Sequence, residues 1–335
     1  MNGIKLPTYK ARINTFPIYG AVSSIIPTGE EYEAWFYNNF IQLRYLVKDH
    51  ILFFDQYRSL MFSCPYITTE RISRDTIEKK WVDYCLFLKD KISEGRYVLL
   101  FCDRFAMSRY VKDYHVNHIL HELFVIGYDD DKEVFHCMDN GTRGMYVELT
   151  IPYEEVRNSL DFTEVSDYSL YFSYAYCIKQ EAWWDADLLD EQQILNMYED
   201  YSKSKYRKNI VEPFTNVHYG FRVHYDVLDD LKKGIEVRKP RKDVRGIYLL
   251  NEHKKIMCNR FKSLYEMTSK SVYKSMEEKY SRIAGGYSVL IFKFLKCASD
   301  EKDESWWAFY EEFKGLVNQE KDAADFFSSE LLQNM

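Results

Sequence analysis

The sequence lacks any run of roughly 18 apolar residues, the length a helix needs to cross a bilayer. Its first residues, Met1 to Gly20, also lack the apolar stretch of a secretory signal. We therefore expect a cytoplasmic protein with no membrane partner. Basic residues are outnumbered by acidic ones, and the net charge is −7. Because nucleic-acid-binding domains are usually basic, we expect no nucleic-acid partner.

Closely spaced pairs of cysteines are also missing from the sequence. The seven cysteines show no C-x-x-C spacing and lie at positions 64, 85, 102, 137, 177, 258 and 297. Scattered thiols of this kind are typical of a reducing cytosol, where disulfide frameworks are rare. The chain also lacks internal repeats and low-complexity tracts. Its 335 residues are enough for two domains.

The sequence changes character near residue 182. Before it, helical and strand patterns alternate: amphipathic character predicts helices over 30–60 and 75–93, and the apolar run 97–102 predicts a buried strand. After it, amphipathic helical segments dominate, and we predict them over 188–205, 223–233, 247–267, 273–296 and 304–327. We therefore expect an α+β fold with a first domain over 1–182 and a helical domain or lid over 183–335.

The most informative stretch runs from residue 118 to residue 140. His121 precedes an apolar run, Gly127 begins a turn with an acidic tip, and a second run ends at Asp139. This order predicts a strand, a turn and a returning strand. In an antiparallel pair the start of one strand lies beside the end of the next, so Asp139 is placed to orient the His121 imidazole. Such a pair usually activates a cysteine or serine nucleophile.

A metal site is the first alternative for this histidine-rich stretch. His115, His118 and His121 precede Glu122, but the order H-x-x-H-E differs from the zinc-binding H-E-x-x-H. In a strand, positions i and i+3 also point to opposite faces. We therefore predict no metal and interpret His118 as a groove residue that supports the site. It remains open that these histidines are merely satisfied polar residues at a strand entrance.

Several of these features together resemble the papain-like fold. A strand ends in Asp103, His121 and an apolar run follow, Gly127-Tyr128-Asp129 forms the turn, and the next strand ends in Asp139. The order is similar to that of the C39-like branch, which includes the butirosin biosynthesis protein H N-terminal-like family. The resemblance covers about residues 10 to 180 and is loose over the helical remainder.

The resemblance implies a nucleophilic cysteine near the start of the first long helix. There the helix dipole and the histidine would stabilise a thiolate. The corresponding position holds Ala21, which is the main departure from the family pattern. Three interpretations stay open: Ala21 replaces a native cysteine in an engineered variant, the chain is a natural protein that binds without reacting, or Ser23, Ser24 or Cys64 is the nucleophile.

The resemblance also implies an activity. Its known members transfer acyl groups from carrier-protein thioesters to amines, so we expect an amide-bond-forming acyltransferase of nonribosomal peptide or antibiotic biosynthesis. Position 21, His121 and Asp139 would form the triad, with Asn14 and Asn140 supporting the oxyanion. No cofactor is expected beyond the phosphopantetheine arm of an acyl or peptidyl carrier protein, and the acceptor would be a small amine. The alternatives are a cysteine peptidase and a catalytically dead binding or scaffold protein.

A basic stretch in the helical half is a candidate docking surface for an acidic carrier protein. Its cations are Lys232, Lys233, Arg238, Lys239, Arg241, Lys242 and Arg245. An ordinary solvated loop explains the same composition equally well.

Overall fold

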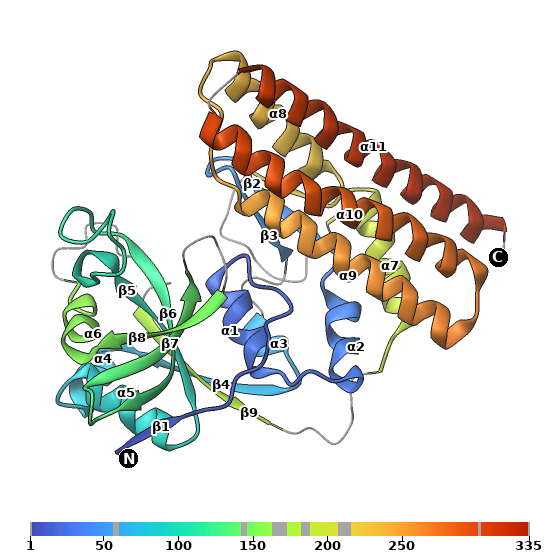
Figure 1. The fold of residues 1–335 in the computed structure, drawn as a ribbon. Coiled ribbons are helices and arrows are strands. Elements are labelled where there is room, and N and C mark those ends of the chain that lie inside the picture. Colours follow the sequence, from blue (N-terminus) through green and yellow to red (C-terminus); the bar gives the residue numbers. More distant parts are fainter. Residues whose placement is uncertain are drawn as a thin grey trace. The chain divides into compact units, whose positions relative to one another are not determined.

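The structure is a computed structural model that describes residues 2–55, 60–141, 146–162, 173–181, 188–206, 216–300 and 303–333. The chain divides into two compact units: residues 1–29 and 59–186 form the first, and residues 30–58 and 187–335 form the second (Figure 1). The predicted boundary after residue 182 lies outside the described residues. Residues 30–58, which we predicted to be in the first domain, belong to the second unit.

The first unit is built on an antiparallel sheet. Its strands lie in the order β4 (Ile67–Ser73), β9 (Tyr174–Gln180), β5 (Tyr97–Asp103), β6 (Leu120–Asp129), β7 (Val134–Asn140) and β8 (Tyr146–Pro152), and β1 (Gly3–Lys5) also pairs with β6. The predicted strand 97–102 is the buried strand β5. Its continuous apolar run fits a strand that is covered on both faces.

The helices of the first unit are short: α1 (Pro17–Ile25), α3 (Leu60–Ser63), α4 (Arg74–Lys80), α5 (Tyr84–Ser93), α6 (Tyr153–Ser159) and the 3-10 turn η2 (Arg104–Ala106). The predicted helix 75–93 is in fact two helices. The Asp83 side chain accepts a hydrogen bond from the backbone N–H of Leu86, and this N-cap starts α5. Helix α1 begins with Pro17, a favoured residue in the first turn.

The second unit is mainly helical. A small sheet has the order β10 (Val217–Tyr219), β2 (Leu43–Leu46) and β3 (Ile51–Phe54), and the helices are α2 (Glu30–Asn39), α7 (Glu191–Ser202), α8 (Arg222–Glu236), α9 (Arg245–Thr268), α10 (Ser271–Asp300) and α11 (Asp303–Gln333). The five helices predicted after residue 188 are confirmed. The predicted long helix 30–60 is wrong, because α2 ends at Asn39 and the chain then forms the β2–β3 hairpin.

Helix α2 joins the second unit through buried polar contacts. The guanidinium of Arg260, which is fully buried on α9, donates hydrogen bonds to the carbonyls of Tyr37 and Phe40. His253 Nε2 lies 2.9 Å from the carbonyl of Ile41. The last carbonyls of a helix have no partner within the helix, so α9 supplies these donors from a distant part of the sequence.

A buried ion pair lies at the centre of the second unit. Lys254 Nζ on α9 lies 2.6 Å from Glu320 Oε1 on α11, and both side chains are fully buried. Tyr201 of α7 donates to the same carboxylate oxygen at 2.8 Å, and its hydroxyl lies 2.8 Å from His224 Nε2 on α8. Tyr280 of α10 also donates to Glu320 Oε1, at 3.3 Å, so five helices share one polar network.

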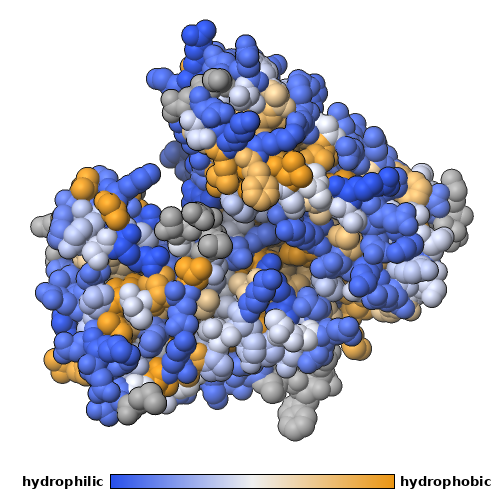
Figure 2. Space-filling model, in the orientation of Figure 1, coloured by the Kyte–Doolittle hydropathy of each residue, from blue (hydrophilic) through white to orange (hydrophobic). Residues whose placement is uncertain are grey.

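The surface is mostly hydrophilic on the face drawn in Figure 2, with hydrophobic side chains gathered in patches on both units. Helix α10 contributes the exposed Val289, Phe292 and Leu295, which recur every three residues. No helix among the described residues is both long and apolar enough to cross a bilayer.

Candidate functional site

The predicted histidine–aspartate pair is present in the sheet of the first unit. His121 lies near the start of β6, Asp139 lies near the end of β7, and the two strands are antiparallel neighbours. His121 Nε2 is 2.9 Å from Asp139 Oδ1. The prediction that these side chains lie within hydrogen-bonding distance is confirmed.

Asp139 is fully buried, and its carboxylate is well satisfied. Oδ1 accepts from His121 and from the backbone N–H of Asn140 at 2.7 Å, and Oδ2 accepts from the Tyr110 hydroxyl. Burial on its own would raise the pKa of Asp139. The hydrogen bonds from His121 and Tyr110, together with the nearby positive charges, outweigh burial and hold the pKa below its ordinary value.

Arg104, at the start of η2, contacts the other side of the imidazole. Its Nη2 lies 2.9 Å from His121 Nδ1. A guanidinium only donates, so Nδ1 must accept and the ring proton must be on Nε2, where it is donated to Asp139. His121 is therefore held as one neutral tautomer with both ring nitrogens occupied. A base that activates a thiol needs one nitrogen available to receive the thiol proton.

Strand alternation places the imidazole on one particular face of the sheet. His121 lies opposite Cys102 of β5 and shares its face with Leu123 and Val125. These three neighbours belong to a buried cluster that includes residues of α4, α5 and α6. The His121 ring also packs edge-on against Tyr110, which contacts the same cluster. The pair therefore points toward the α4–α6 side of the sheet.

Helix α1 also packs on β6 and β7. A Cβ atom at Gly20 would lie 2.5 Å from the ring of Tyr146, so this ring rests directly on the backbone of α1. Tyr146 lies opposite Asn140 in the sheet, and Asn140 belongs to the alternate set of side chains from Asp139. Helix α1 and the His121 imidazole are thus separated by the sheet.

This arrangement argues against the predicted role of position 21. Ala21 is fully buried in the middle of α1, on the sheet face that His121 does not share. The two predicted oxyanion residues do lie together, because Asn140 Nδ2 donates to the carbonyl of Asn14 at 2.6 Å. They lie on the α1 side, however, and their role at an oxyanion stays a prediction.

The other candidate nucleophiles are buried as well. The hydroxyl of Ser23 donates to the carbonyl of Ile13 at 2.9 Å, and that of Ser24 donates to the carbonyl of Ala21 at 3.0 Å. Cys64 is buried. Burial raises the pKa of the thiols of Cys85, Cys102, Cys137, Cys177, Cys258 and Cys297. Thiolates, the reactive form, are therefore disfavoured at these six positions.

A second histidine–aspartate pair lies one strand away, and sequence analysis missed it. His118 Nδ1 is 2.6 Å from Oδ2 of Asp103, the last residue of β5. Asp103 Oδ1 accepts from the backbone N–H groups of Phe105 and Ile119, both at 3.0 Å. The His118 ring stacks on the ring of Phe105, with centroids 4.2 Å apart. Our prediction of His118 as a groove residue did not include this aspartate.

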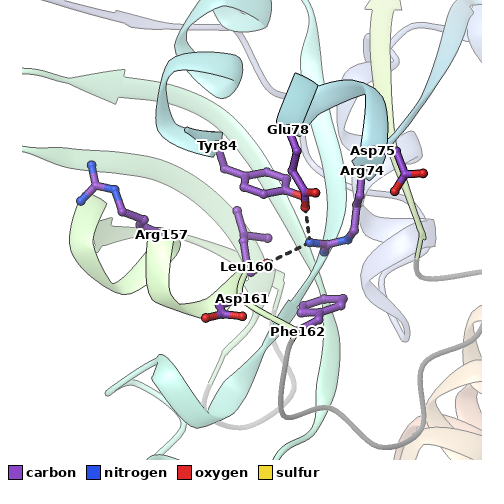
Figure 3. Close-up of a pocket in the computed structure, with 8 residues that line it drawn as sticks. All are labelled: Arg74, Asp75, Glu78, Tyr84, Arg157, Leu160, Asp161 and Phe162. Atoms are coloured by element: carbon purple, nitrogen blue, oxygen red, sulfur yellow. Dashed lines mark hydrogen bonds between the residues drawn. The ribbon is translucent and has the colours of Figure 1, made fainter. Parts of the chain in front are cut away.

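This second pair lines a cavity of about 780 Å³. Its lining residues come from the end of β5, η2 and the segment that follows (Asp103, Phe105, Ala106, Tyr114, His115 and His118) and from α6 and the residues after it (Glu154, Glu155, Arg157, Asn158 and Asp161). A neighbouring cavity of about 450 Å³ shares Arg157 and Asp161 with it (Figure 3). In that second cavity the Arg74 guanidinium donates to the Leu160 carbonyl at 3.1 Å.

The predicted docking cations lie at the end of α8, in the following turn and at the start of α9. All seven are exposed or partly exposed. Acidic neighbours neutralise part of their charge: Asp243 pairs with both Arg241 and Arg245, and Arg238 pairs with Asp303. Their role in docking a carrier protein stays a prediction.

Comparison with models of known protein families found no match to this chain, and comparison with curated proteins found none either. Among the described residues, no group of three or more histidine, cysteine, aspartate or glutamate side chains is arranged to hold a metal ion. The two histidine–aspartate pairs of the first unit are the features whose geometry bears on function.

Proposed function

We propose that this chain is a papain-like protein that binds its ligands without forming an acyl-enzyme intermediate. The observation that carries this proposal is the state of His121, whose Nε2 donates to Asp139 while Nδ1 accepts from Arg104. An imidazole with both nitrogens occupied acts as a structural group. Ala21 offers no thiol, and α1 lies on the other face of the sheet.

The fold and the cysteines support two further parts of this proposal, the papain-like assignment and a cytoplasmic location. An antiparallel sheet with histidine and aspartate on adjacent strands supports the papain-like assignment. The seven cysteines are free thiols, which supports a reducing, cytoplasmic location.

An amide-forming acyltransferase remains the second candidate. The contact between Nε2 and Oδ1 favours it, because it directs Nδ1 away from the aspartate, as a thiol-activating imidazole requires. For acyl transfer from a carrier-protein thioester to a small amine, Arg104 would have to leave Nδ1 and a thiol would have to reach it. A cysteine peptidase needs the same two changes.

The substitution Ala21→Cys separates the two candidates. If the chain only binds, the new thiol should react with iodoacetamide no faster than the buried native cysteines, because no imidazole lowers its pKa. It should also fail to accelerate aminolysis of an acyl-phosphopantetheine thioester. Mass spectrometry of labelled peptides gives the rate at each cysteine.

The matched control is Ala21→Cys combined with His121→Ala. If the introduced thiol labels fast in the single variant and slowly in the double variant, His121 activates position 21. That result would replace the binding proposal with the acyltransferase. Circular dichroism of both variants establishes that the added sulfur leaves the buried helix intact.

A further inference from the structure

The cavity beside His118 differs in character from the buried pair at His121. The His118 side chain is 32% exposed, whereas Asp103 beneath it is 4% exposed. Three hydrogen bonds fix the Asp103 carboxylate, which in turn fixes the imidazole. The contact of Nδ1 with this carboxylate favours a proton on that nitrogen.

The charge around the cavity is mainly negative. Four carboxylates line it, those of Asp103, Glu154, Glu155 and Asp161, against the single guanidinium of Arg157. Arg157 is already paired with Asp83, which lies outside the lining, at 3.3 Å. Glu155 accepts from the Ser108 hydroxyl at 2.7 Å. Within the part of the chain that the structure describes, Glu154 has no ion-pair partner.

Aromatic rings form another part of the wall. Phe105 carries the stacked His118 ring and also meets His115 edge-on, with centroids 5.1 Å apart. The Tyr114 ring lies 4.0 Å from His115. Aromatic faces attract cations through their quadrupole and also accommodate apolar groups. The cavity thus combines negative charge with aromatic surface.

We propose that this cavity binds an organic ammonium ion that carries an aromatic or aliphatic body. An ammonium group presents three donors, which match the carboxylates that line the cavity. The body of the ligand packs on Phe105 and Tyr114. The cavity volume of about 780 Å³ is within the range of small-molecule sites. This site is separate from His121 and position 21, so it goes beyond the proposed function.

Calorimetric titration with phenethylammonium tests the proposal, with the neutral 2-phenylethanol as a matched ligand. The ammonium should bind, and the alcohol should bind at least roughly tenfold more weakly, since charge-assisted hydrogen bonds contribute more than neutral ones. Equal affinity for both ligands would overturn the proposal. Absence of binding at about 10 mM ammonium, where even a weak site would fill, would overturn it as well.

Two substitutions test whether the ammonium ion binds in this cavity. Glu154→Gln and His118→Gln should each weaken ammonium binding several-fold, whereas Glu311→Gln, which makes the same charge change on α11, should leave it unchanged. Binding that none of the three variants alters would show that the ligand lies elsewhere and would contradict the proposal. The His118 ring resonances give a second readout: they should shift on titration with the ammonium, and an unchanged spectrum would count against this cavity. The Ala21→Cys experiment addresses position 21, so the two proposals can fail independently.

Discussion

The two histidine–aspartate pairs of the first unit use the same residue types to opposite effect. At His121, a guanidinium and a carboxylate occupy the two ring nitrogens, and the side chain is only 11% exposed. At His118, the carboxylate holds the ring from below and the ring lines a cavity. A histidine beside an aspartate therefore indicates function only when its ring also lines space that a ligand can enter. Pairs of this kind are also common here: His50 with Asp230 and His218 with Asp226 are two more among the described residues.

The largest difference between the pairs should appear when each carboxylate is removed. Asp139→Ala leaves the buried donors of His121 and Tyr110 without an acceptor, so we expect a loss of about 3–5 kcal/mol in the free energy of unfolding. Asp103→Ala removes a cap whose backbone donors lie in an exposed connection, and we expect a loss of about 1–2 kcal/mol in the free energy of unfolding. Urea denaturation at neutral pH measures both. A larger loss for Asp103→Ala would reverse our ranking of the pairs.

Removal of the imidazoles should give a smaller difference in the same direction. His121→Ala should cost about 1–3 kcal/mol, because it leaves the buried Asp139 with one hydrogen bond fewer. His118→Ala should cost less than about 1 kcal/mol, since that side chain is partly exposed. The midpoints of thermal unfolding report the order. Similar losses for both variants would mean that the His118 ring is as important to the fold as the His121 ring.

The buried Asp139 carboxylate should also make the free energy of unfolding depend on pH in the acidic range. The folded pKa of Asp139 lies below its ordinary value of 3.8, so the folded state prefers the charged form. Its contribution is fully present above the ordinary pKa and is lost as pH falls through the folded pKa. We expect Asp139→Asn to flatten this part of the curve of unfolding free energy against pH. Parallel curves for the wild type and the variant would show that Asp139 is not the group responsible.

The smallest expected difference between the pairs lies in the tautomers of their imidazoles and not in the free energy of unfolding. His121 should carry its proton on Nε2, since Nδ1 accepts from Arg104, and His118 should carry its proton on Nδ1 beside Asp103. Nitrogen-15 chemical shifts of the two imidazoles distinguish these forms. The same tautomer at both rings would remove the basis for separating a structural pair from a ligand-binding pair.

The sequence predicted the parts of the site that depend on neighbouring strands. Antiparallel strands place a residue that starts one strand beside a residue that ends the next, which located His121 beside Asp139. The same rule would have found His118 beside Asp103, since these residues flank the connection between β5 and β6. The contact with Arg104 could not be predicted, because it depends on the path of η2 after β5 ends.

The position of α1 could not be predicted from the sequence either. Alternation shows that His121 shares a face with Leu123, but no local pattern tells which face a distant helix covers. The boundary between the units was missed for a related reason. Arg260 and His253, far along the chain, bind the backbone that follows and ends α2, and only the tertiary structure reveals these contacts.

The ion pair between Lys254 and Glu320 has a consequence for how the second unit forms during synthesis. While the ribosome has not yet released α11, Lys254 has no carboxylate to meet in the interior, and an unpaired buried ammonium is costly. Its burial lowers its pKa to about 8, with Glu320 opposing that shift. The earlier helices therefore pack around Lys254 only after Glu320 has left the ribosome, and until then the lysine side chain stays hydrated. Synthesis of Glu320 must therefore precede closure of this core, and a product truncated before that residue should be removed by proteases.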